Sequence, residues 1–404
     1  MDPAERMHVI SELCSFEGRL AGTDAERRAA NRLAERLREA GRPAEVEPTY
    51  VHPQFGLVHG AHCLLGVAGS LIGVAIPALG FGLVLLAATS MYLDLNYRLY
   101  LVRYLFFRRA SQNVVSPGRR PGLPARVIIT AHYDAARTGA AFKPKRARRS
   151  ARLAERHPWL GPFQPIFWSL ALLLPALGAR MAGFDSDAIA LVQLPPTLVL
   201  LFAVFVLADI ELSDVVPGAN DNASGVATAL ALAEELDADP PRHLDVWVVL
   251  PGAEECLQEG MRSFVRAHRE SLNEQPAYFV NLDTVGRGSV RYLTAGGWIL
   301  THGMDPRLVD LAAAIAEADA EGENHFAATP AARGLAGDEM PPRLAGHPAI
   351  AIGCTEEDGY VPGYHLSSDL PAEIDPRSLE RAHGFTLELI RRLDADVGRR
   401  SGAR

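Results

Sequence analysis

The sequence predicts an α/β domain in which helices flank a mostly parallel, mixed sheet, with two apolar helical hairpins inserted into the chain. Strand-like and helix-like segments alternate over the second half, as in proteins built around a parallel sheet. Long uncharged stretches interrupt the first half, and they are long enough to be transmembrane helices. We therefore expect a soluble α/β domain carrying two transmembrane insertions.

The alternation in the second half is regular. Short apolar runs such as HLDVWVVL and AYFVNL are rich in β-branched and aromatic residues, which is typical of buried strands. The expected strands are His243–Leu250, Ala277–Leu282, Val290–Thr294 and Ala349–Gly353. The expected helices are Asn222–Leu236, Gly260–His268, Pro306–Ala320 and Pro376–Leu393.

The first half supplies further elements on both sides of the first apolar block. Two amphipathic helices and a strand are expected before it, over Asp2–Leu13, Thr23–Ala40 and Glu45–Val51. Thr23 or Asp24 suits the N-cap of the second helix, and Gly41 suits its end. Two strands are expected after the block, over Asn113–Val115 and Arg126–Thr130.

The apolar segments predict membrane-crossing hairpins. A crossing needs about 20 apolar residues, and Leu160–Gly178 and Ala188–Ala208 are each near that length. Leu64–Leu93 is longer than one crossing and short for two. Since the strands on both sides of each insertion are expected to join one sheet, each insertion must cross an even number of times or not at all. We expect two hairpins and four crossings; the alternatives are helices buried in a large soluble core and an apolar contact between copies of the chain.

Positive charge gathers beside these segments, although the net charge of the chain is −8. A net negative charge argues against nucleic acid as a partner. Arginines follow the first block, and the basic tract Lys143–Arg156 precedes the second, so the positive-inside rule places the α/β domain in the cytoplasm. Four scattered cysteines, expected to be reduced, agree with that placement. We expect a multi-pass protein of the inner cell membrane, with the basic tract either meeting anionic headgroups or forming a solvated loop.

The first residues, MDPAERMHVI, are charged and contain no apolar core, so no cleavable signal peptide is expected.

Five short islands rich in His, Asp and Glu carry the chemistry: AHYD, GANDNASG, GAEE, NLDT and YHLSSD. Each alone is a weak signal, because a histidine at a strand end is commonly paired with a nearby acid. Together they supply two histidines, several acids and an adjacent Glu-Glu pair, mostly at strand ends. Such oxygen and nitrogen ligands suit a two-metal site. The residues concerned are His132, Asp134, Asp221, Glu254, Glu255, Asp283, His365 and Asp369.

With these motifs in this order, the chain resembles the M28 family of zinc aminopeptidases. The resemblance begins at GRLAGTDAERRAANRLAERLREAG, residues 18–41, and reaches the last helix. It covers nearly all of the sequence outside the apolar insertions. It implies a sheet-centred α/β domain and two divalent metal ions, expected to be Zn²⁺.

The resemblance implies five metal ligands. By motif, His132 and Asp283 would bind one ion, Glu255 and His365 would bind the other, and Asp221 would bridge the two. The second hairpin lies between the first ligand motif and the second, where the family has a short loop.

Four other acids receive supporting roles. The resemblance makes Glu254 the general base, and it matches Asp338 to an acidic position near the substrate pocket. The spacing of Asp134, two residues from the first histidine ligand on an extended segment, suits a partner that orients that imidazole. Asp369 is expected to support the second histidine similarly. His325 and His347 lie outside the motifs and are expected to be surface or loop residues.

The implied activity is that of a membrane-bound, binuclear zinc aminopeptidase, in which a metal-bridging hydroxide attacks the first peptide bond. The alternatives are a glutaminyl-cyclase-like acyltransferase on the same fold and a non-catalytic membrane scaffold. The expected partners are a peptide substrate and the lipid bilayer, and a homo-oligomer stays open. The expected peptidase domain comprises residues 1–56, 94–157 and 213–404, with membrane insertions at 57–93 and 158–212.

Overall fold

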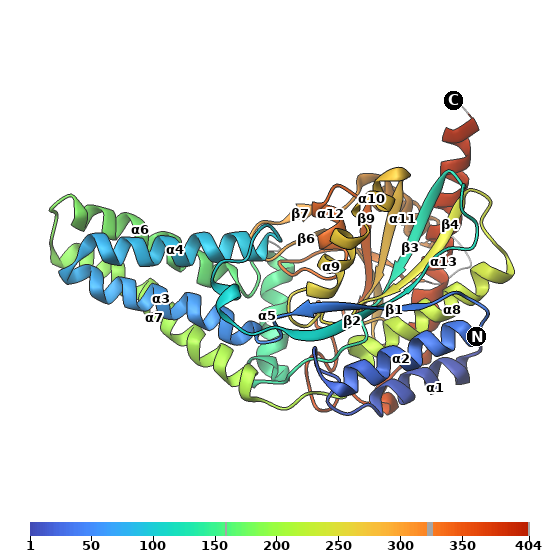
Figure 1. Cartoon of the computed structure of the whole chain (residues 1–404), viewed down its shortest axis with the longest axis horizontal. Helices are drawn as coiled ribbons and strands as arrows, with labels where there is room; N and C mark the ends of the chain where they lie inside the picture. The colour runs from blue at the N-terminus through green and yellow to red at the C-terminus, as the bar shows by residue number, and fades with distance from the viewer. Residues whose placement is uncertain (158–159, 321–325, 403–404) are drawn as a thin grey trace.

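The computed structural model describes residues 1–157, 160–320 and 326–402 of the chain. Its main body is built around a mixed sheet, and four long helices extend from one end of that body as a bundle (Figure 1). The predicted α/β fold class is confirmed, because helices flank a sheet whose central strands are parallel.

The sheet places the carboxyl ends of its parallel strands along one edge. Its strands follow the order β1 (Glu45–Val51), β2 (Arg109–Ser116), β4 (Leu244–Leu250), β3 (Ala125–Thr130), β5 (Ala277–Leu282), β9 (Ala349–Thr355), β6 (Ser289–Gly296) and β7 (His302–Gly303), with β8 (Thr329–Ala332) paired to β6. β3 pairs parallel with β4 and with β5, and β5 pairs parallel with β9. The loops that follow these four strands therefore start side by side.

Alternate side chains of the central strands point into two separate cores. In β3, Val127 and Ile129 belong to the larger core and Ile128 to the smaller one. The larger core is covered by α1 (Pro3–Cys14), α2 (Asp24–Glu39), α8 (Ser224–Ala238), α11 (Pro306–Ala320) and α13 (Pro376–Gly402). The smaller core is covered by α9 (Glu259–Ala267) and α10 (Arg269–Glu274). Burying each such aliphatic side chain stabilises the fold by about 1.5–3 kcal/mol.

Most expected elements form where the sequence places them, with shifts of a few residues at their ends. The side-chain oxygen of Thr23 accepts a hydrogen bond from the N–H of Glu26 at 3.2 Å, so Thr23 is the N-cap of α2. Gly41 follows this helix with a φ of +76°, which glycine adopts without strain. The basic tract forms a helix, α5 (Pro144–Arg156), so the alternative of a solvated loop is wrong. The sequence also misses β7, β8, α10 and α12 (Met340–Leu344), which are too short to show a periodicity.

Four helices form two hairpins, α3 (Phe55–Ala75) with α4 (Pro77–Leu95) and α6 (Gln164–Met181) with α7 (Asp187–Leu212). The first apolar block is short for two helices, yet two form, because α3 begins well before it. Pro77 suits the first position of α4, where its missing N–H costs nothing. By length and composition alone, α3, α4 and α7 could cross a membrane. The four crossings stay a prediction.

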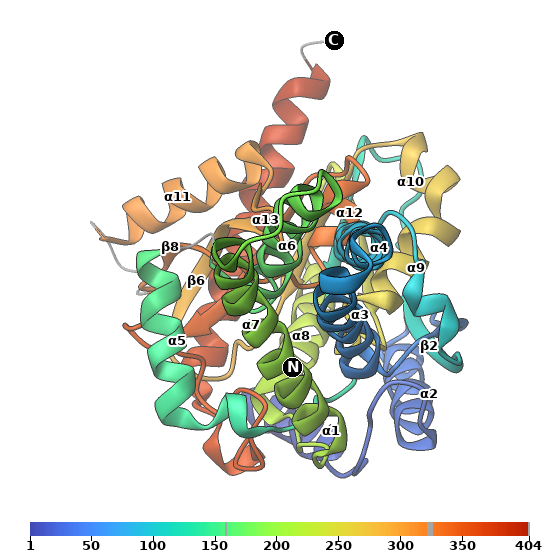
Figure 2. The ribbon, with the colours of Figure 1, turned by 90° about the vertical axis from the view of Figure 1, so that its left-hand side faces the viewer.

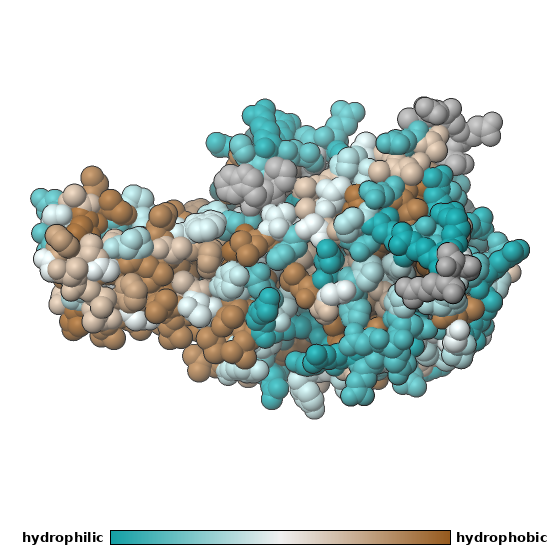
Figure 3. All heavy atoms as spheres, turned by 90° about the horizontal axis from the view of Figure 1, so that it is seen from above, coloured by the Kyte–Doolittle hydropathy of each residue, from teal (hydrophilic) through white to brown (hydrophobic). Residues whose placement is uncertain are grey.

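Apolar side chains make up much of the face of the bundle that Figure 3 shows. Phe202 and Phe205 of α7 are 69% and 66% exposed, and Leu71 of α3 and Leu85 of α4 are exposed as well. The alternative that these helices are buried in a soluble core is therefore wrong. An exposed apolar surface of this kind is typical of contact with a membrane or with another protein.

A buried ion-pair cluster fastens the first hairpin to the body. Arg103, in the short helix η1 (Val102–Leu105) after α4, lies 2.9 Å from Oδ2 of Asp94 and 2.7 Å from Oε1 of Glu259. The backbone N–H of His52 also donates to Glu259, at 3.0 Å. The cluster thus joins the end of α4, the end of β1 and the start of α9. Removing one partner of a buried pair typically costs about 3–5 kcal/mol, so this junction is firmly held.

Glycines allow α3 and α4 to pack with their backbones in contact. A Cβ atom built on Gly80 of α4 would lie 2.4 Å from the carbonyl oxygen of Gly69 and 2.4 Å from Cα of Gly73, both in α3. Backbone cannot yield in the way that a flexible side chain can, so Gly80 is required at this crossing. The equivalent atom on Gly82, also in α4, would meet no heavy atom within 4 Å.

We expect Gly80→Ala to lower the melting temperature, because the new methyl group must push the two helices apart at a cost of about 1–3 kcal/mol. Gly82→Ala is the matched control, and it should be neutral or stabilise the helix by up to about 1 kcal/mol. Thermal unfolding of both variants in the same detergent makes the comparison. Equal melting temperatures would contradict the close contact.

Candidate metal centre

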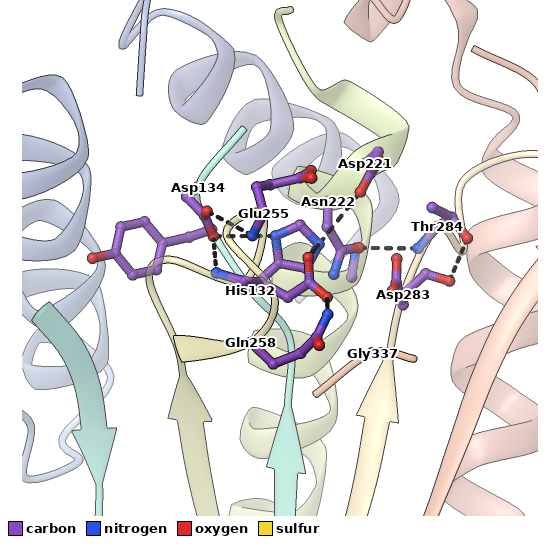
Figure 4. A network of polar contacts seen from close by, with 12 residues as sticks. His132, Asp134, Asp221, Asn222, Glu255, Gln258, Asp283, Thr284 and Gly337 are labelled. Carbon is purple, nitrogen blue, oxygen red and sulfur yellow. Dashed lines mark hydrogen bonds and ion pairs between the residues drawn. The ribbon is translucent and has the colours of Figure 1, made fainter. Parts of the chain in front are cut away.

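The parallel strands bring the predicted ligands to one edge of the sheet. His132 follows β3, Glu254 and Glu255 follow β4, and Asp283 follows β5. Two more residues reach the same place from loops: Asp221 precedes α8, and His365 follows β9. Figure 4 shows His132 between Asp134 and Asp221, above the ends of the strands.

Two groups of three ligands share Asp221. The first comprises His132, Asp221 and Asp283, and the second comprises Asp221, Glu255 and His365; within each group the ligand atoms lie within 4.8 Å of one another. Oδ1 of Asp221 is 3.3 Å from Nε2 of His132, and Oδ2 is 3.3 Å from Nε2 of His365. One carboxylate therefore reaches both histidines, as a bridging ligand must.

Burial disfavours charge on the carboxylates of the cluster. Desolvation, with a contribution from Asp221, raises the pKa of the Asp283 carboxyl to about 7. Desolvation also raises the pKa of Glu254 well above its usual range, against the opposing effect of His132. Burial alone would lower the pKa of His365, but the neighbouring carboxylates outweigh it and raise that pKa to about 10. The cluster holds more acids than its two histidines can neutralise, which favours bound cations.

Unpaired oxygens point to the same conclusion. Oε1 of Glu255 is buried and accepts no hydrogen bond. Both carboxylate oxygens of Asp338, which is fully buried close to the cluster, also lack a partner. Buried polar atoms without partners are uncommon and need an explanation. Imidazole nitrogens with carboxylate oxygens form a typical donor set for zinc and similar divalent ions, so these residues fit bound metal.

Asp134 supports two ligand segments at once. Its two carboxylate oxygens accept hydrogen bonds from the backbone N–H groups of Glu254 and Glu255, each at 3.1 Å. Its Oδ1 also lies 3.4 Å from Nδ1 of His132. Asp134 is therefore positioned to fix the imidazole and the Glu-Glu loop together (Figure 4).

Asp369 occupies a different place from the one that the sequence predicts. It was expected beside His365, whereas its carboxylate accepts hydrogen bonds from the backbone N–H groups of Asn220 at 2.8 Å and Asp221 at 3.0 Å. It therefore holds the loop of the shared ligand, whose peptide bond to Asn222 is cis. This correction arises because Asp369 and Asp221 are far apart in the sequence, and only the fold brings them together.

Several ligand loops have left-handed backbone conformations. Ala253, Thr284 and His365 have φ values of +54°, +56° and +53°. Non-glycine residues in this region cost about 1–3 kcal/mol each and persist where the surroundings over-determine them. Ala253 precedes Glu254, and Thr284 follows Asp283, so the strain is concentrated at the cluster.

Gln258 is a residue of the site that sequence reasoning missed. Its Nε2 donates to Oε1 of Glu254 at 2.5 Å and to the carbonyl oxygen of Ala336 at 3.0 Å. Its Oε1 accepts from the hydroxyl of Tyr97 at 2.7 Å and from Nε1 of Trp298 at 3.0 Å. Since an indole nitrogen only donates, it fixes the amide orientation and leaves the NH₂ group facing Glu254. A lone Gln after GAEE gives no signal of this in the sequence.

One of the two histidines outside the motifs, His347, is a described residue. His347 lies in the loop between α12 and β9, as expected, and is buried there with its ring 5.9 Å from that of Phe279. His325 lies outside the described residues.

A small cavity of about 10 Å³ lies between the cluster and the base of the bundle. Glu255 and His365 line one part of it. Phe55, the first residue of α3, and Ile210 and Glu211, near the end of α7, line another. The approach to the site therefore adjoins the junction of body and bundle.

Solved structures share the fold at low sequence identity. A Zn-dependent exopeptidase from Parabacteroides distasonis is 15% identical with a TM-score of 0.54, covering 96% of this chain and 97% of that one. A glutaminyl cyclase from Bacteroides thetaiotaomicron is 16% identical with a TM-score of 0.55, covering 96% and 97%. A zinc aminopeptidase from Bacillus subtilis is 14% identical with a TM-score of 0.56, covering 96% and 94%. At these identities the likeness concerns the fold.

Comparison with curated proteins gives no match. The sequence model of peptidase family M28 matches residues 203–390. This range contains five residues of the cluster: Asp221, Glu254, Glu255, Asp283 and His365. The predicted resemblance to peptidase family M28 is thereby confirmed over residues 203–390.

Proposed function

We propose that the chain is a membrane-bound metallo-aminopeptidase that binds two divalent cations, expected to be Zn²⁺. The observation that carries this proposal is the pair of ligand groups that share Asp221. His132, Asp283 and one oxygen of Asp221 would hold one cation. Glu255, His365 and the other oxygen would hold the second. Such a pair supplies Lewis acidity, which polarises a carbonyl group and makes water a nucleophile at neutral pH.

Glu254 is the proposed general base. It lies in neither of the two groups that share Asp221, and its Oε2 is 3.9 Å from Nε2 of His132. Its carboxylate takes a proton from the attacking water while the new C–O bond forms. It then delivers that proton to the leaving nitrogen as the C–N bond breaks, so that water is added across the peptide bond. The NH₂ group of Gln258 holds the carboxylate in place for both transfers.

A glutaminyl-cyclase-like acyltransferase is the alternative enzyme, because the fold also occurs in glutaminyl cyclases. Cyclisation expels ammonia and consumes no water, whereas hydrolysis needs an activated water molecule. The two ligand groups that share Asp221, with Glu254 beside them and outside both, support the hydrolase. The same set of residues argues against a scaffold that has lost catalysis.

We expect a panel of peptides with varied N-terminal residues to be split with the gain of water, as measured by mass spectrometry. Glu254→Gln should lower turnover by about 10²–10⁴-fold, because it removes the proton acceptor. It should keep its metal, which is measured on the same preparation. Asp221→Asn is the matched charge-neutralising variant, and it should lose metal as well as turnover.

Loss of ammonia from an intact peptide would assign the cyclase reaction instead. Near-normal turnover in Glu254→Gln would contradict its role as the base, and full metal content in Asp221→Asn would contradict a bridging ligand.

Gln258→Met should lower kcat by about 10–100-fold at similar KM, because a hydrogen bond to a charged group contributes about 1.5–3 kcal/mol. Methionine keeps the shape and lacks the donor. Tyr97→Phe, which removes a bond to the other end of the amide, should have a smaller effect in the same direction. Metal content and melting temperature serve as controls, and an unchanged kcat in Gln258→Met would rule out the positioning role.

We also propose that the bundle crosses the inner membrane and that the peptidase domain lies in the cytoplasm. The support is the apolar exterior of the bundle, three helices of sufficient length, and basic residues at the body end. The turn between α6 and α7 lies at the far end of the bundle (Figure 1) and would then face outward.

A cysteine introduced by Ser186→Cys, at the start of α7, should react with an impermeant maleimide on intact cells. Ser150→Cys, on the exposed side of α5, should react only after lysis. The native cysteines are buried or half-buried, and the unsubstituted protein measures their background. The opposite pattern of labelling would reverse the orientation.

A further inference from the structure

The basic helix α5 lies across the base of the bundle. In Figure 1 it runs at right angles to the long axis of the bundle, at the junction with the body. Figure 2 looks along the bundle, and α5 is again seen from its side, next to the bundle helices and in front of the body. If the bundle crosses a bilayer along its axis, α5 lies parallel to the bilayer surface.

The outward side of α5 is strongly basic. The half-buried residues are Ala147, Arg148, Ala151 and Ala154, and they mark the side that faces the body. The exposed side carries the cations Lys145, Arg146, Arg149, Arg152 and Arg156. They recur at helical spacing around Leu153, which is 45% exposed.

Some of the cations of α5 already form ion pairs within the protein. Arg148 pairs with Glu356 and Asp358, and Arg152 lies 3.1 Å from Asp358. These contacts fasten α5 to the loop after β9. Within the described ranges, the side chains of Lys145, Arg149 and Arg156 form no ion pair, so their charge is available to a partner.

We propose that α5 binds the anionic phospholipid headgroups of the membrane in which the bundle lies. The inference rests on the membrane placement in the proposed function and is independent of the peptidase chemistry. Each basic residue near an anionic surface contributes roughly 1 kcal/mol, and long basic side chains can reach the phosphates while Leu153 enters the interface. A net charge of −8 over the whole chain argues against nucleic acid as the occupant.

The test uses the full chain in nanodiscs made of phosphatidylcholine alone or with increasing phosphatidylglycerol. A fluorophore is attached through Leu153→Cys, and quenching by headgroup-spin-labelled lipid reports the contact. We expect quenching to rise with phosphatidylglycerol. The Lys145→Glu/Arg149→Glu variant should weaken the apparent affinity for phosphatidylglycerol by at least about 30-fold, as expected for the loss of two such charges.

The matched control is Arg242→Glu/Arg399→Glu, which makes the same change in charge on exposed residues away from the bundle. It should behave like the unsubstituted protein. Quenching that does not depend on phosphatidylglycerol, or an equal loss in both double variants, would overturn the proposal. A saturable change in the fluorescence of the label, caused by inorganic phosphate or an RNA oligonucleotide in phosphatidylcholine discs, would overturn the proposal as well. Failure of the protein to co-elute with lipid would overturn the membrane placement itself. Absence of peptidase activity would leave the quenching measurement unaffected.

Discussion

Mutual repulsion among buried carboxylates is the constraint on which the rest of the structure depends. Asp221, Glu255 and Asp283 converge at one edge of the sheet with few cations of the protein's own nearby. Carboxylates held this close together are tolerable only when their charges are compensated, which the shared geometry of the two ligand groups would allow metal ions to do. The surroundings hold the acids against that repulsion: Asp134 and Asp369 accept hydrogen bonds from the backbone of the ligand loops, and these contacts help to maintain the strained residues there.

The sequence predicts what depends on short-range pattern and misses what depends on tertiary contact. Buried strands show as apolar runs, and β1 and β5 have the bounds expected from the sequence. Ligands that follow such strands can be found because the carboxyl ends of parallel strands meet. Asp369 was placed beside the wrong partner, and Gln258 was not found, because their contacts join residues that no local pattern relates. The basic tract was ambiguous for another reason: charge alone does not distinguish a solvated loop from a helix held by acids of another loop.

The site and the bundle are physically continuous. Tyr97, directly after the first hairpin, donates to Gln258, which donates to Glu254. Two residues before α5 begins, the ring of Phe142 lies 4.4 Å from that of His365. The cavity beside the cluster is lined by the first residue of α3 and the last turns of α7. A change in how either hairpin or α5 meets its surroundings can therefore reach a residue of the metal cluster through one or two contacts.

The position of the second hairpin between His132 and Asp221 also sets an order of assembly. Chains are synthesised from the N-terminus, and domains tend to fold in that order. The first histidine leaves the ribosome well before the bridging acid, and α6 and α7 emerge between them. The two ligand groups that contain Asp221 can assemble only after α6 and α7 have formed an antiparallel hairpin, which returns the chain to the sheet. A chain that stops within this hairpin therefore contains His132 but lacks Asp221, the residue that both ligand groups share.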